Sequence, residues 1–177
     1  MSDEQDTIEG PETQIAQAPP NPQGRSATRE DKMRFFDELL APMRKIGEMT
    51  GIHEDLLLTL AAHESGWWGA VAQPGTQNLS RDKNNPFGFV KGGKKVTYPS
   101  LETALNVFRD DRWGQHLKDV NDIEEFVKKL QDEPPKDWKR YNSEYPDPNT
   151  YKDQLRRMYK SVLAAKKEWQ GERFSEP

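Results

Sequence analysis

One segment of the chain places a carboxylate on an apolar helix face. Helical spacing over residues 56–69 puts Glu64 in line with Leu57 and Leu60. Loss of water and the negative end of the helix dipole both favour the protonated form of a carboxylate in such a place. General-acid catalysis near neutral pH requires a protonated carboxyl. The spacing alone leaves open that Glu64 is a solvated residue at a helix end.

Two tryptophans follow this helix. Gly66 is expected to turn the chain, so that Trp67 and Trp68 lie beside the carboxyl. Aromatic faces next to a carboxylic acid suit a sugar ring, whereas ordinary core packing is the alternative role for two tryptophans. The segment is therefore compatible with a carbohydrate site in which Glu64 is the acid, and a solvated glutamate with two core tryptophans is the alternative.

The elements that position this segment are predicted to be mostly helical. Pro42 is expected to interrupt or restart the first helix, because proline lacks the N–H that a helix interior needs. Ser100, Asn121 or Asp122, and Thr150 are expected to cap later helices. Apolar residues recur at helical spacing over 29–40, 42–49, 53–65, 101–108, 123–130 and 151–169.

The remaining segments predict one hairpin and two long loops. Residues 87–98 resemble two short strands around the Gly92-Gly93 turn. The stretches 69–86 and 131–149 have no apolar period and are expected to be polar loops. The predicted fold class is α+β, mainly α, with a small β-hairpin.

Composition excludes several classes of function. The formal net charge of −4 is unlike the basic surface of a nucleic-acid binder. The absence of cysteine excludes disulfides, cysteine-based zinc sites and thiol nucleophiles, and the three histidines have no ligand spacing. The apolar run 56–62 is far shorter than the roughly 20 residues of a membrane span. We expect no cofactor, no metal, no nucleic-acid partner and no membrane span.

Residues 1–29 differ from the rest of the chain. They contain no aromatic residue, four of the 13 prolines, and five acidic against two basic residues. Such a segment buries too little apolar surface to offset ordering, so 1–29 is predicted to be a disordered acidic tail and 30–177 one folded domain. The tail has neither a basic start nor an apolar stretch, so it is not predicted to be a signal peptide.

The run 62–67, Ala-His-Glu-Ser-Gly-Trp, resembles the A-x-E-S-G-W signature of the lysozyme-like glucosaminidases of glycoside hydrolase family 73. Three further segments follow in the family's order. Residues 85–89 resemble its N-x-F-G-I strand, and residues 96–105 resemble its F-x-x-Y-x-S-x-x-E-A-L segment, with the acid displaced by one position. Residues 141–151 resemble the family's late tyrosine segment. The resemblance covers about 42–158. The string E-S-G-W alone also suits lytic transglycosylases and goose-type lysozymes, whereas the ordered set is more specific.

The resemblance implies a lysozyme-like domain that cleaves the glycan strands of peptidoglycan. Glu64 matches the catalytic acid, which protonates the glycosidic oxygen as an oxocarbenium-like sugar develops. In the late segment Tyr141 matches the family's functional tyrosine better than Tyr145 does. The candidate substrate-binding residues are Trp67, Trp68, Phe87, Phe89 and Tyr98.

The second carboxylate is left open by the sequence. Asp82 and Glu102 are the first candidates, and Asp110 and Asp111 are two further acids. An inverting enzyme needs a carboxylate about 6.5–9.5 Å from the acid, and a retaining enzyme needs one about 5–5.5 Å away. Assistance by the N-acetyl group of the substrate is the third alternative.

The cellular role follows from the substrate. A short glucosaminidase-like domain with an acidic leader resembles antibacterial effectors of type VI secretion, which reach a target cell's periplasm or cell wall without a signal peptide. The expected partners are peptidoglycan glycan strands, an immunity protein that occludes the active-site groove, and a component of the secretion apparatus. The alternatives are a muramidase or lytic transglycosylase of phage or cell-wall remodelling origin, and a non-catalytic module that binds glycan or the secretion apparatus.

Overall fold

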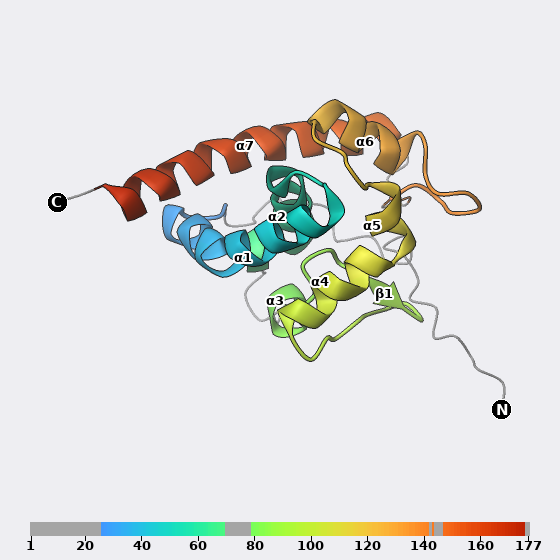
Figure 1. Cartoon of the computed structure of the whole chain (residues 1–177), viewed down its shortest axis with the longest axis horizontal. Coiled ribbons are helices and arrows are strands. Elements are labelled where there is room, and N and C mark those ends of the chain that lie inside the picture. Colours follow the sequence, from blue (N-terminus) through green and yellow to red (C-terminus); the bar gives the residue numbers. More distant parts are fainter. Residues whose placement is uncertain (1–25, 70–78, 142, 144–146, 176–177) are drawn as a thin grey trace.

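The computed structural model describes residues 26–69, 79–141, 143 and 147–175 (Figure 1). It confirms the predicted fold class, because the described residues are mainly helical with one small antiparallel hairpin. The elements in chain order are α1 (Arg29–Thr50), α2 (Glu54–Gly69), α3 (Leu79–Asp82), β1 (Val90–Lys91), β2 (Lys94–Lys95), α4 (Leu101–Asp110), α5 (Arg112–His116), α6 (Ile123–Gln131) and α7 (Pro148–Phe174).

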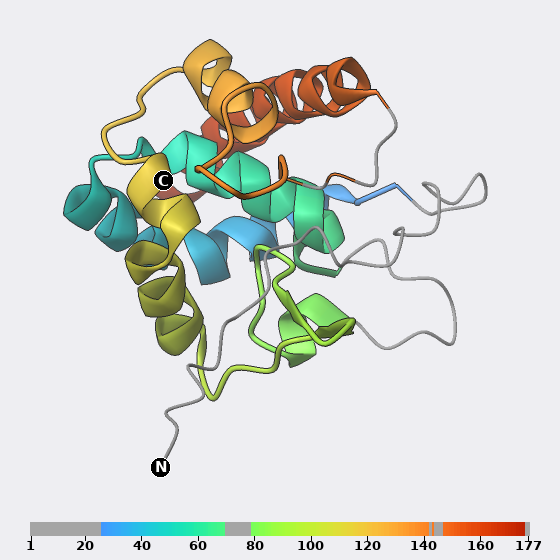
Figure 2. The ribbon, with the colours of Figure 1, turned by 90° about the vertical axis from the view of Figure 1, so that its right-hand side faces the viewer.

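Helix α2 lies at the centre of the molecule. It packs against α1, α3 and α7, and α6 packs beside α7 (Figure 1). In the turned view, α6 and α7 lie on one side of α2, and the hairpin and α3 lie on the other (Figure 2). The C-terminal end of α2, which carries Glu64, is therefore placed between the helical layer and the hairpin.

Helix α1 is continuous, and the expectation that Pro42 interrupts it is wrong. Proline cannot donate the hydrogen bond to the carbonyl four residues earlier, which is that of Glu38. Tertiary packing compensates for this lost bond, because the apolar side chains on both sides of Pro42 are buried: Leu39, Leu40, Met43 and Ile46. Thr28 closes the start of the helix with a capping box to Asp31.

The later helices begin at side-chain caps. Ser100 accepts a hydrogen bond from the Thr103 amide at 3.1 Å, as predicted, and Asp122 caps α6. The prediction for Thr150 is wrong, because α7 begins earlier: Asp147 is its cap, and Pro148 fills the first turn, where no N–H is needed. The short helices α3 and α5 were not predicted, and α3 lies within the expected loop 69–86.

The hairpin forms where it was predicted, although its ladder is short. Val90 pairs with Lys95, and both Gly92 and Gly93 have positive φ, at 56° and 73°, as a tight two-residue hairpin turn requires. The base is held by the buried side chain of Asn85, which donates to the carbonyls of Phe89 at 2.8 Å and Val96 at 3.0 Å. This amide fixes the segment that leads from α3 to the hairpin.

Candidate active site

The helical part of α2 ends at Ser65 and continues as a left-handed turn. Gly66, Trp67 and Trp68 have φ of 59°, 56° and 61°, which confirms the predicted turn at Gly66. A left-handed conformation costs about 1–2 kcal/mol for each non-glycine residue. Ser65 offsets part of this cost, because its hydroxyl donates to the Ala61 carbonyl at 2.5 Å and accepts from the Trp68 amide at 2.8 Å.

Helix α1 anchors both tryptophans. The Trp67 ring stands edge-on to Phe35 at 5.2 Å, with the ammonium of Lys32 5.1 Å from its centroid. The Trp68 indole N–H donates to Glu38 Oε2 at 2.7 Å, and Arg81 Nε of α3 donates to the same oxygen at 3.1 Å. These contacts fix the chain direction directly after Glu64.

Glu64 is buried against α7. Only 2% of the residue is exposed, and the hydroxyl of Tyr151 donates to its Oε1 at 2.6 Å. The imidazole Nδ1 of His63 lies 3.5 Å from the same oxygen. A carboxyl that is held by a hydroxyl donor and shielded from water has the environment in which an acid can transfer a proton to a bound substrate.

Tyr151 is the site residue that sequence reasoning missed. The sequence placed it only on the apolar stripe of the last helix, although it ends the late tyrosine segment 141–151. It is fully buried, and its ring lies 6.4 Å from that of Tyr141 and 5.1 Å from the imidazole of His63. Its hydroxyl, rather than that of Tyr141, contacts the Glu64 carboxyl.

The hydroxyl of Tyr141 is engaged elsewhere. It donates to the carbonyl of Phe87 at 2.7 Å, and the side chain is fully buried. Burial, followed by the negative charge of Glu64, raises the pKa of Tyr141 well above its usual value. This bond ties the segment before α7 to the start of the hairpin. A role of Tyr141 in the reaction stays a prediction, and Tyr145 lies outside the described residues.

The five predicted sugar-contacting residues all lie in the core, where each is at most 6% exposed: Trp67, Trp68, Phe87, Phe89 and Tyr98. Phe87 stacks on Phe108 with ring centroids 4.3 Å apart. The Tyr98 hydroxyl is buried and makes no hydrogen bond within the described part of the chain. Burial, followed by the charge of Asp111, raises its pKa to about 12. Contact of these side chains with a glycan stays a prediction.

The candidate second carboxylates differ in their surroundings. Asp82 and Glu102 are exposed, in contrast to Glu64. Asp110 is exposed and pairs with Arg109 at 2.8 Å. Asp111 caps α5 by accepting from the Gly114 amide at 3.0 Å, and burial raises its pKa to about 6. Asp111 therefore has a structural role already, and the identity of a second catalytic carboxylate stays open.

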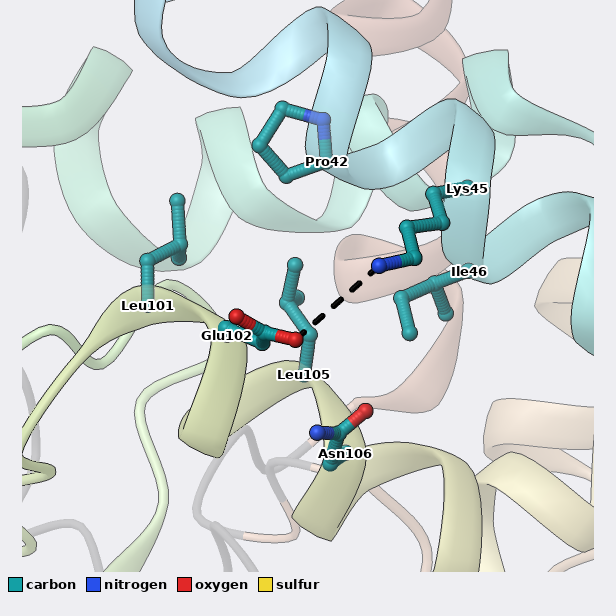
Figure 3. A pocket seen from close by; sticks show the side chains of 7 residues that line it. All are labelled: Pro42, Lys45, Ile46, Leu101, Glu102, Leu105 and Asn106. Atoms are coloured by element: carbon teal, nitrogen blue, oxygen red, sulfur yellow. Dashed lines mark ion pairs between the residues drawn. The ribbon is translucent and has the colours of Figure 1, made fainter.

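Glu102 lines a pocket between α1 and α4 (Figure 3). Its carboxylate faces the ammonium of Lys45 at 3.9 Å across this pocket. The volume of about 180 Å³ is below the roughly 300–1,000 Å³ of small-molecule sites. Glu64 is not among its lining residues, so this pocket is separate from the candidate site. The lining residues are Pro42, Lys45, Ile46, Leu101, Glu102, Leu105 and Asn106.

The described residues contain no cluster of three or more His, Asp or Glu side chains that could hold a metal ion. In the same ranges, none of the helices combines the length and the apolar character needed to cross a membrane.

Comparison with known proteins identifies the family. The family model described as mannosyl-glycoprotein endo-beta-N-acetylglucosaminidase matches residues 41–172. Searches of curated proteins and of solved structures gave no significant match. The matched range contains Glu64, Tyr141, Tyr151 and the hairpin between them. The chain therefore belongs to the glucosaminidase family and is a glycoside hydrolase that acts on peptidoglycan.

Proposed function

We propose that Glu64 is the general acid with which this chain hydrolyses an N-acetylglucosaminyl bond of peptidoglycan. One observation carries the proposal: the Glu64 carboxyl is buried at the end of α2 and accepts a hydrogen bond of 2.6 Å from the Tyr151 hydroxyl. The family match over 41–172 includes both residues and supports the same assignment.

The proposed reaction moves one proton from Glu64 to the glycosidic oxygen. As the bond from this oxygen to the anomeric carbon breaks, positive charge develops on the sugar, and water completes the hydrolysis. Glu64 becomes a carboxylate in the same step. A hydrogen bond to a charged acceptor is stronger than one to a neutral acceptor, so the Tyr151 hydroxyl stabilises the transition state more than the ground state.

Substrate contacts are part of the proposal. Because Glu64 is only 2% exposed, the groups that cover it must move before a glycosidic oxygen reaches hydrogen-bond distance. The buried Tyr98 hydroxyl is a candidate to bond a sugar hydroxyl, because it makes no hydrogen bond within the described residues. Trp67, Trp68, Phe87 and Phe89 would then act mainly as the packed support of the site.

Replacement of Glu64 by glutamine tests the assignment. The amide keeps the size of the side chain and can still accept from Tyr151, but it has no proton to transfer. We expect Glu64→Gln to abolish cleavage of purified peptidoglycan while the variant stays folded. Glu48→Gln is the matched control, because it makes the same change at an exposed glutamate of α1 that is not a candidate for the second carboxylate, and we expect it to retain wild-type turnover. Wild-type turnover of Glu64→Gln would exclude Glu64 as the acid.

We further propose that the protein is an antibacterial effector that a secretion apparatus delivers to the periplasm of a target cell. The support is the peptidoglycan substrate together with the resemblance of a short glucosaminidase domain with an acidic leader to such effectors. An immunity protein would then protect the producing cell by covering the groove at Glu64.

Expression with and without a secretory leader tests this role. We expect the exported protein to lyse the host, the non-exported protein to be harmless, and the exported Glu64→Gln variant to be harmless, as read from culture density. Equal toxicity without export would show that the target lies in the cytoplasm and would contradict the proposal.

A further inference from the structure

The residue before Glu64 is held in a second set of contacts across the same helix pair. The His63 side chain is 13% exposed, and its Nε2 lies 3.0 Å from the side-chain oxygen of Gln154 on α7. Gln154 follows Tyr151 by three residues, so both project from one face of α7. Helix α7 therefore contacts two consecutive residues of α2, Glu64 through Tyr151 and His63 through Gln154.

The contact with Gln154 determines the orientation of the imidazole proton. An amide oxygen only accepts hydrogen bonds, so Nε2 of His63 must be the donor. In the neutral imidazole, Nδ1 then carries a lone pair. This nitrogen lies 3.5 Å from Oε1 of Glu64, which is within ion-pair distance but longer than an ordinary hydrogen bond. A single proton placed on either group can therefore be shared with the other.

We propose that His63 is a positioning residue that shares a proton with Glu64. This sharing sets the highest pH at which the reaction proceeds, and the role rests on Glu64 being the acid. One microstate has a protonated Glu64 and a neutral His63, and the other has a Glu64 carboxylate and a cationic His63. The proton moves between Oε1 and Nδ1 with no other bond made or broken. The two groups therefore titrate as a pair rather than as independent sites.

The electrostatic surroundings support this pairing. Burial lowers the pKa of His63, but the contact and charge interaction with the Glu64 carboxylate, together with the Gln154 contact, outweigh burial and raise the pKa above its usual value. Among the described residues, the titratable groups that interact with Glu64 include Tyr151 on α7, Tyr141, and Lys95 of β2. Burial is the main cause that lowers the pKa of Lys95, and the charge of Glu64 opposes it.

The consequence for catalysis is a wider range of pH in which a proton is available. Up to the raised pKa of His63, the pair retains one proton, and the microstate with the proton on Glu64 is the one that donates this proton to the glycosidic oxygen. After the transfer, Glu64 is a carboxylate between the Tyr151 hydroxyl and the imidazole.

Titration of His63 by nuclear magnetic resonance tests the pairing without any activity. The chain has three histidines, and the resonance that disappears in His63→Gln identifies the one of interest. We expect the pKa of His63 to fall by about one unit or more in Glu64→Gln, because the variant keeps the burial and loses the negative charge. An unchanged pKa of His63 in Glu64→Gln would overturn the proposal.

The pH profile of kcat/KM tests the catalytic consequence. We expect the alkaline limb of the kcat/KM profile to lie about one pH unit lower in His63→Gln than in the wild type. The control His53→Gln, at a half-exposed histidine near the start of α2, should keep the wild-type profile. A purely structural role of His63 would reduce the rate without moving the limb, and that result would contradict the proposal.

The two experiments separate this inference from the proposed function. If Glu64→Gln keeps full activity, the proposed function fails, whatever the titration shows. If Glu64→Gln is inactive but neither the His63 pKa nor the alkaline limb moves, only the pairing of His63 with Glu64 fails.

Discussion

The hydrogen bond from Tyr151 to Glu64 predicts a defined loss of rate when the hydroxyl is removed. Tyr151→Phe keeps the ring, which packs 5.1 Å from His63 and 6.4 Å from Tyr141, so the fold should be retained. A hydrogen bond to a charged group contributes about 1.5–3 kcal/mol. The bond of 2.6 Å becomes charge-assisted only as Glu64 ionises. The Tyr151→Phe variant therefore loses this stabilisation mainly in the transition state. At about 1.4 kcal/mol per tenfold change, we expect kcat to fall roughly 10- to 150-fold.

The assay is the steady-state rate of release of soluble fragments from purified peptidoglycan. Tyr159→Phe is the matched control, because it removes a hydroxyl from a half-buried tyrosine two turns further along α7. We expect this control to keep the wild-type kcat, and both variants to melt within a few degrees of the wild type. A Tyr151→Phe variant that is folded and has the wild-type kcat would refute the reasoning.

Three further predictions concern stability. Pairing with Arg44 and Lys166 lowers the pKa of Glu54 from 4.5 to about 2, so the stabilisation from this pairing is present above pH 4.5 and is lost as the pH falls towards 2. Because solvent screens this partly exposed pairing, Glu54→Gln should cost about 1 kcal/mol in urea unfolding at pH 7 and almost nothing near pH 2. Removal of residues 1–25 should leave the melting temperature unchanged, whereas removal of 1–29 also deletes the Thr28 cap and should cost about 1 kcal/mol. Ser65→Ala removes the two bonds that hold the left-handed turn and should cost about 1–2 kcal/mol and lower kcat.

The parts of the structure that depend on local chemistry were predictable from the sequence. The side chains of Ser100 and Asp122 cap helices because they satisfy amides only three residues away. The Gly92-Gly93 turn follows from the backbone angles that a two-residue hairpin needs. The spacing of Glu64 from Leu57 and Leu60 predicts the buried face on which it lies, and the resemblance of residues 62–67 to the family signature indicates that it is the acid.

The parts that depend on tertiary packing were not predictable in the same way. The contact between Tyr151 and Glu64 joins residues 87 positions apart, and that between Gln154 and His63 joins residues 91 apart. Helical spacing placed Tyr151 on a buried stripe but did not say which helix it faces. Pro42 shows the opposite error, because local propensity predicted a break that burial of its neighbours overrides.

Analysis of the chain ends released from peptidoglycan by wild type and Glu64→Gln tests the central claim most directly. We predict that the wild type releases fragments with reducing N-acetylglucosamine ends and that Glu64→Gln, folded and at equal concentration, releases none. Reducing N-acetylmuramic acid ends would indicate a muramidase, and anhydro ends would indicate a lytic transglycosylase. Release of the same fragments at the same rate by Glu64→Gln would contradict the account.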